Sequence, residues 1–156
     1  MSSPFDLIFG ISAIAFNLLI TTVFILSRSE KMQLVQRVGL GLIVLGIPFT
    51  VVLIHTIAAG NNLYIRVALA VVLAYIMTEL LFDFILHFDF RSRFITHFPY
   101  IILEYGAFVG LIYTAFTIND FWGWAVSVTF WIAMAALIYY FTGKKKSKQQ
   151  LKKKKK

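Results

Sequence analysis

Five long apolar segments dominate this chain, at about residues 5–27, 39–59, 63–88, 99–118 and 121–142. Each has roughly the 20 residues that an α-helix needs to cross about 30 Å of hydrocarbon. Only 14% of the residues are charged, whereas soluble domains have about 25%. Backbone groups cannot stay unpaired in lipid, and these segments are uniformly apolar rather than alternating, so they predict helices and not barrel strands. We therefore expect an all-α integral membrane protein, in which residues 1–142 form a single five-transmembrane-helix bundle.

The positions of Lys and Arg predict the orientation of the bundle, because short cytoplasmic loops are enriched in both residues. Five bases lie in the loops after the first and third segments: Arg28, Lys31, Arg37, Arg91 and Arg93. The loops on the other side carry only Arg66 and the stretch "TIND". We expect the N-terminus outside and the C-terminus in the cytoplasm. The membrane would be the plasma membrane of a prokaryote or the endoplasmic reticulum of a eukaryote.

A lysine-rich tail, "GKKKSKQQLKKKKK", occupies residues 143–156. It holds nine of the fifteen basic residues and leaves six bases against seven acids in the rest of the chain. Such a run is predicted to be disordered and to lie on anionic lipid headgroups, gaining about 1 kcal/mol per lysine near the surface. The lysines closest to the bilayer are Lys144, Lys145, Lys146 and Lys148. Nucleic acid is the less favoured partner, because lipid phosphate is the nearer anion.

The end of this tail also matches a short targeting pattern. Lys153 and Lys154 are the fourth and third residues from the end. Their placement resembles the dilysine retrieval signal of endoplasmic-reticulum membrane proteins, which implies that location for a eukaryotic chain.

Ionisable residues interrupt the third apolar segment at a helical spacing. Glu79, Asp83 and His87 are four residues apart, so on an α-helix they share one face. Counted from the cytoplasmic end of the segment, Asp83 lies about 8 Å deep and Glu79 about 14 Å deep. Glu104, in the next segment, lies at roughly 7 Å. If the faces of the two antiparallel helices match, the four side chains converge on one site in the cytoplasmic half of the bundle.

This cluster predicts the binding of a proton or a cation. Carboxylates within hydrogen-bonding range cannot all be ionised in a low dielectric, so they hold protons, share one, or bind a cation. Carboxylates together with an imidazole suit Mn, Fe or Zn, and a divalent metal ion is the cofactor that Glu79, Asp83, His87 and Glu104 would hold. In the alternative interpretation, His87 and the adjacent Asp89 are merely solvated at the membrane surface.

Three hypotheses for function follow from these residues. The leading one is a small multi-pass membrane protein that binds, and in its fuller form translocates, a proton or a divalent cation. The first alternative is an intramembrane enzyme, with or without a metal, that acts on a lipid from the cytoplasmic leaflet. The second is a non-catalytic subunit or assembly factor of a larger membrane complex, whose carboxylates pair with a basic residue of the partner.

Small and polar residues predict how the helices pack. Gly106, Gly110 and Thr114 are four apart, forming a small-residue stripe that lets another helix approach closely. We expect this stripe to pack within the chain, with a homo-oligomer as the alternative. Asn17 is expected to form hydrogen bonds between helices.

Overall fold

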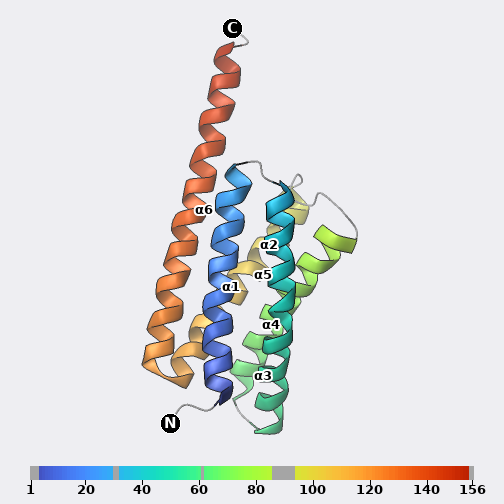
Figure 1. Ribbon diagram of the computed structural model, residues 1–156, viewed down its shortest axis with the longest axis vertical. Helices are drawn as coiled ribbons and strands as arrows, with labels where there is room; N and C mark the ends of the chain where they lie inside the picture. Colours follow the sequence, from blue (N-terminus) through green and yellow to red (C-terminus); the bar gives the residue numbers. More distant parts are fainter. Residues whose placement is uncertain (1–3, 30–31, 61, 86–93, 155–156) are drawn as a thin grey trace.

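The computed structural model describes the backbone of residues 4–29, 32–60, 62–85 and 94–154, and the side chains of residues 4–29, 33–60, 62–82 and 99–142. Within these residues the chain is entirely helical (Figure 1). The elements are α1 (Pro4–Arg28), α2 (Met32–Val44), α3 (Gly46–Ala58), α4 (Leu63–Glu79), the π-helical segment η1 (Leu80–Ile85), α5 (Phe94–Ile118) and α6 (Asp120–Lys154). The predicted all-helical fold agrees with this description.

Five helices in the described part of the chain are long and apolar enough to cross a membrane. They are Pro4–Arg28, Gln33–Ala58, Leu63–Phe82, Pro99–Ile118 and Asp120–Thr142. The second of these contains both α2 and α3, which meet at Leu45. Pro48 lies just after this junction and has no N–H to donate back to the preceding turn, which accounts for an interruption there.

The helices form a bundle in which α1 packs mainly against α6, and α4 mainly against α5 (Figure 1). Large side chains fill its centre, including the fully buried Phe9, Phe16, Phe49 and Phe108. The connection between α5 and α6 is tight because Asn119 serves as a cap: its Oδ1 accepts a hydrogen bond of 2.9 Å from the backbone N–H of Trp122. This cap supplies a partner for one of the N–H groups that a helix start leaves unpaired.

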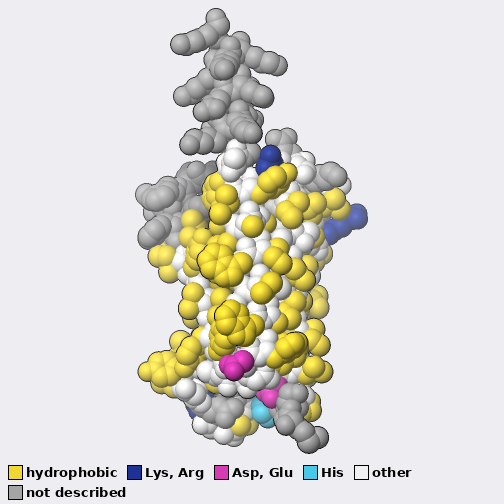
Figure 2. All heavy atoms as spheres, turned by 90° about the vertical axis from the view of Figure 1, so that its left-hand side faces the viewer, with side chains coloured by type: hydrophobic (Ala, Val, Ile, Leu, Met, Phe, Trp, Pro, Cys, Tyr) yellow, Lys and Arg dark blue, Asp and Glu magenta, His cyan; other side chains and the backbone are white. Residues whose placement is uncertain are grey.

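The outer surface of the bundle is as apolar as its centre. In Figure 2, hydrophobic side chains cover the middle of the visible face, and the charged side chains lie near its two ends. Exposed residues include Trp131 at 69% and Ile138 at 67% of their full accessible surface. An apolar surface of this extent is unfavourable in water, which supports a membrane location.

The lysine tail differs from its prediction. We expected disorder from residue 143 onward, but α6 continues as a helix to Lys154. Lys and Gln are good helix formers, and extending an existing helix avoids the unfavourable nucleation step. The side chains of Lys144, Lys145, Lys146 and Lys148 lie outside the described ones, so their contact with lipid headgroups stays a prediction.

Candidate functional site

Two antiparallel helices each contribute a tyrosine and a glutamate with the same spacing. Tyr75 and Glu79 are four apart on α4, and Tyr100 and Glu104 are four apart on α5. A four-residue step keeps both side chains on one face of an α-helix, and these two faces meet. All four residues are buried, with Glu79 only 7% and Glu104 only 8% exposed.

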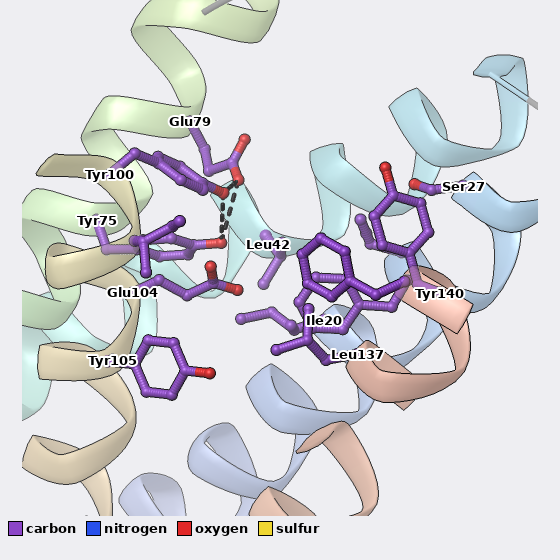
Figure 3. A pocket seen from close by; sticks show the side chains of 14 residues that line it. Ile20, Ser27, Leu42, Tyr75, Glu79, Tyr100, Glu104, Tyr105, Leu137 and Tyr140 are labelled. Atoms are coloured by element: carbon purple, nitrogen blue, oxygen red, sulfur yellow. Dashed lines mark hydrogen bonds between the residues drawn. The ribbon is translucent and has the colours of Figure 1, made fainter. Parts of the chain in front are cut away.

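The tyrosine hydroxyls connect the two helices through Glu79. The Tyr75 hydroxyl donates to Glu79 Oε1 at 3.1 Å and lies 2.9 Å from the Tyr100 hydroxyl. The Tyr100 hydroxyl also donates to Glu79 Oε1. Figure 3 shows these three groups together, with the Glu104 carboxyl beside them and directed into the same space. Carboxyl and phenol groups in contact provide neighbouring positions between which a proton can move.

These residues form one wall of a cavity of about 330 Å³. The cavity lies in the half of the bundle nearer to the chain's C-terminus, where α4 ends and α5 begins (Figure 1). Its other walls are mainly apolar and come from α1, α2, α5 and α6; their residues include Ile20, Val23, Phe24, Leu42, Ile101, Leu137, Tyr140 and Phe141. The site therefore combines an oxygen-rich end with an apolar body.

The cavity also reaches the outer surface of the bundle. Tyr105 on α5 and Phe141 on α6 both line it, and they are 39% and 55% exposed. Part of the cavity lining is therefore exposed on the outer surface of the bundle.

The third segment changes helix type within the predicted ladder. The prediction treated residues 63–88 as one α-helix, but α4 ends at Glu79 and η1 occupies Leu80–Ile85. A π-helix closes its hydrogen bonds at i→i+5, whereas an α-helix closes them at i→i+4. The side chain of Asp83 and the whole of His87 lie outside the description.

Of the four predicted ligands, the structure thus places Glu79 and Glu104 at one cavity. Among the residues that it describes, no group of three or more His, Cys, Asp or Glu side chains is arranged to hold a metal ion. Two tyrosines, Tyr75 and Tyr100, lie next to Glu79. Tyr100 was not among the predicted site residues, and it is buried in the site. The signal that could have identified it is the repeated Tyr-x-x-x-Glu spacing.

The residues predicted for helix packing lie inside the bundle. A Cβ at Gly110 would be 3.1 Å from the Cβ of Ala68, and a Cβ at Gly106 would be 3.2 Å from Val71 Cγ1, so this face of α5 lies directly against α4. Thr114, the third member of the stripe, is also buried. The fully buried Asn17 of α1 donates to α6, to the Val126 carbonyl at 3.1 Å and to Thr129 Oγ1 at 2.9 Å.

A second, smaller cavity of about 210 Å³ lies at the opposite end of the bundle. Its polar lining residues are Asp6, His55, Thr56 and Thr114. Thr114 Oγ1 is buried and has no hydrogen-bond partner among the described residues. The residues of this cavity come from four separate helices, so no local sequence pattern predicts it.

A layer of aromatic rings separates the two cavities. Phe9 lines the smaller cavity and Tyr75 the larger one. Between them the ring centroids of Phe9 and Phe49 are 6.4 Å apart, those of Phe49 and Phe16 6.1 Å, and those of Phe16 and Tyr75 5.6 Å. These are edge-to-face contacts at favourable distances. They close the centre of the bundle in this conformation.

None of the protein-family models, curated proteins or solved structures compared with the chain matches it. The function is therefore argued from the chemistry of the site.

Proposed function

We propose that this protein is a small multi-pass membrane protein that binds and exchanges a proton at Glu79 and Glu104. The observation that carries the proposal is the placement of two buried carboxyl groups in the lining of one cavity, where the hydroxyls of Tyr75 and Tyr100 both donate to Glu79. Ionisable groups inside a membrane protein are costly and by default mark a functional site. A π-helical segment directly after Glu79 is also typical of functional positions.

The proton has a physical role in this arrangement. Two carboxylates that face one apolar cavity repel each other when both are charged, and one shared or bound proton relieves the repulsion. The two tyrosine hydroxyls can pass or share that proton, because a phenol both donates and accepts hydrogen bonds. Glu79, Glu104 and the two tyrosines are thus proposed to act as one titrating unit.

Translocation is the fuller form of this proposal and needs a change of conformation. The larger cavity ends at Tyr75, and the rings of Phe16 and Phe49 separate it from the smaller one. A carrier would expose the carboxyls to the two sides in turn, by moving this aromatic layer. We propose that the described conformation is the one open toward the C-terminal half.

One observation favours a second candidate function. Tyr105 and Phe141 line the cavity and are partly exposed on the apolar outer surface, where a lipid-soluble substrate would meet them, as an intramembrane enzyme requires. In that case Glu79 and Glu104 would serve as general acid and base. Turnover of a lipid by the purified protein, absent in Glu79→Gln, would favour this candidate.

The proposal is tested by labelling with dicyclohexylcarbodiimide, which enters membranes and adds to protonated carboxyl groups. The labelled sites are identified by mass spectrometry of peptides over a range of pH. We expect Glu79 and Glu104 to be labelled at low pH and protected at high pH. In Glu104→Gln, the pH profile of Glu79 should shift, because coupled groups titrate as a pair.

Asp120→Asn is the matched control, because Asp120 is an exposed carboxyl at the start of α6. It should leave the profile of Glu79 unchanged. If Glu79 is unreactive at every pH, or if its profile is the same in wild type and Glu104→Gln, the proposal is wrong.

A further inference from the structure

The larger cavity has more apolar space than a proton or a metal ion would use. Its volume of about 330 Å³ falls in the range of small-molecule sites, which are mostly apolar with a few placed polar groups. The two carboxyl groups lie on one side of the cavity with the hydroxyls of Tyr75 and Tyr100, and the hydroxyls of Ser27 and Tyr140 lie on the opposite side, as Figure 3 shows. Water is a poor occupant of the apolar remainder, because it needs two to four polar partners. The lining fits an organic molecule with one charged end.

The charge of the site selects the polar end of that molecule. An anion would meet two carboxyl groups, and such like-charge contact excludes the wrong ligand. A cation would be attracted by the carboxyls and also by the electron-rich faces of aromatic rings nearby, which is how proteins recognise alkylammonium groups. Tyr105, the residue that follows Glu104, supplies such a ring to the cavity lining.

The route of entry indicates that the ligand is soluble in lipid. Tyr105 and Phe141 line the cavity and are partly exposed on the apolar outer surface of the bundle, where a molecule dissolved in the bilayer would meet them. A molecule with an apolar body would partition into the bilayer first and then enter the cavity.

We propose that the cavity binds a membrane-soluble organic monocation, an ammonium or similar group on an apolar body, with its charge at Glu79 and Glu104. This inference rests on the proposed function, since the same carboxyls would exchange the cation for a proton. The charges balance: as the cation enters, the protonated pair releases its proton to the aqueous phase, and no covalent bond to carbon changes.

The test uses decyltrimethylammonium as the probe and decyl sulfate, which has the same chain and the opposite charge, as the control. Native mass spectrometry of the full-length protein counts the bound molecules, and a pH electrode in weakly buffered solution follows the proton. We expect one specifically bound decyltrimethylammonium, no specifically bound decyl sulfate, and proton release on binding. Binding should weaken as the pH falls, because protons then compete for the same carboxyls.

Two kinds of variant examine the two parts of the site. Glu79→Gln should weaken binding of the probe by about tenfold or more, which corresponds to roughly 1.4 kcal/mol. Tyr105 is partly exposed, so its replacement is compatible with folding. Tyr105→Phe should bind as wild type does, whereas Tyr105→Leu, which has no aromatic face, should bind several-fold more weakly.

Three outcomes would overturn the inference. The first is binding of decyl sulfate as tight as that of decyltrimethylammonium. The second is unchanged binding of decyltrimethylammonium in both Glu79→Gln and Tyr105→Leu. The third is displacement of decyltrimethylammonium by a short-chain phosphatidylethanolamine, which would indicate a zwitterionic lipid as the ligand. Failure of this inference is distinct from failure of the proposed function. A coupled carbodiimide profile without binding of the probe removes the organic cation alone, whereas loss of both results removes both proposals.

Discussion

Replacement of Gly110 by alanine tests the close contact between α4 and α5, which brings the two Tyr–Glu pairs together. The new Cβ would lie 3.1 Å from the Cβ, 3.3 Å from the Cα and 3.4 Å from the carbonyl oxygen of Ala68. Carbon atoms in optimal contact are about 3.5–4.0 Å apart. Two of the three opposing atoms belong to the backbone, so no rotamer change can relieve the overlap, and the helices must separate by roughly half an ångström.

The size of the effect follows from two opposing terms. Overpacking of a close contact costs about 1–3 kcal/mol. A separation of roughly half an ångström also removes about a quarter or more of the van der Waals attraction between α4 and α5. Exchanging glycine for alanine inside a helix returns about 0.8–1 kcal/mol. The net free energy of unfolding of Gly110→Ala should therefore fall by about 0–2 kcal/mol.

Gly41→Ala is a matched control that isolates the packing term. Gly41 lies inside α2, and its added Cβ would meet only the Leu19 methyl groups, at 3.4 and 3.5 Å. Both variants gain the same helix propensity, so the difference between them, about 1–3 kcal/mol, measures overpacking alone. Unfolding would be followed by steric trapping in bicelles, which reports reversible unfolding of a membrane protein. Equal stability of Gly110→Ala and Gly41→Ala would refute the close approach of α4 and α5.

Four further substitutions examine other contacts. Tyr100→Phe keeps the ring but removes a donor to Glu79, and should lower the free energy of unfolding by about 1–3 kcal/mol; no change would contradict the network. Asn17→Leu removes two interhelical hydrogen bonds of about 0.6 kcal/mol each. A fall in the free energy of unfolding above about 3 kcal/mol would show that Asn17 does more than join α1 to α6. Phe16→Ala removes a fully buried ring, at about 3–5 kcal/mol, and should raise proton leakage in liposomes; an unchanged leak would argue against the aromatic layer as the barrier. Arg28→Gln removes a cation–π contact in which the guanidinium carbon lies 3.6 Å from the centroid of the Tyr139 ring. It should lower the free energy of unfolding by about 0.5–1 kcal/mol, measured by the same unfolding assay.

The membrane-spanning elements could be predicted from sequence because apolar length is a local property. A run of about 20 apolar residues favours a spanning helix wherever its neighbours lie, and the five segments correspond to five such helices. The second begins at Gln33, six residues before the predicted start, and the third is described as a span only as far as Phe82. The prediction was less accurate where local signals compete. The lysine run after residue 142 extends α6, because helix propensity and continuation of an existing helix act against charge repulsion.

The composition of the site depended on the tertiary structure. Depth along a helix is readable from residue number at 1.5 Å per residue. The count put Glu104 level with Asp83 rather than with Glu79, yet Glu79 and Glu104 are the two carboxyls that line the cavity. The rotation of each helix about its axis is not readable in this way, because it depends on which side chains interlock across an interface. Packing of Gly106 and Gly110 against α4 sets that rotation for α5.

The sequence by itself therefore determined that the chain has five apolar segments long enough to span a membrane and that they are helical, since both follow from residue type and spacing along one chain. Only the tertiary structure decided that Tyr75 and Tyr100 meet at Glu79, that an apolar cavity lies beside them, and that aromatic rings separate it from a second one. These features are formed by residues distant in sequence, and the packing of whole helices brings them together.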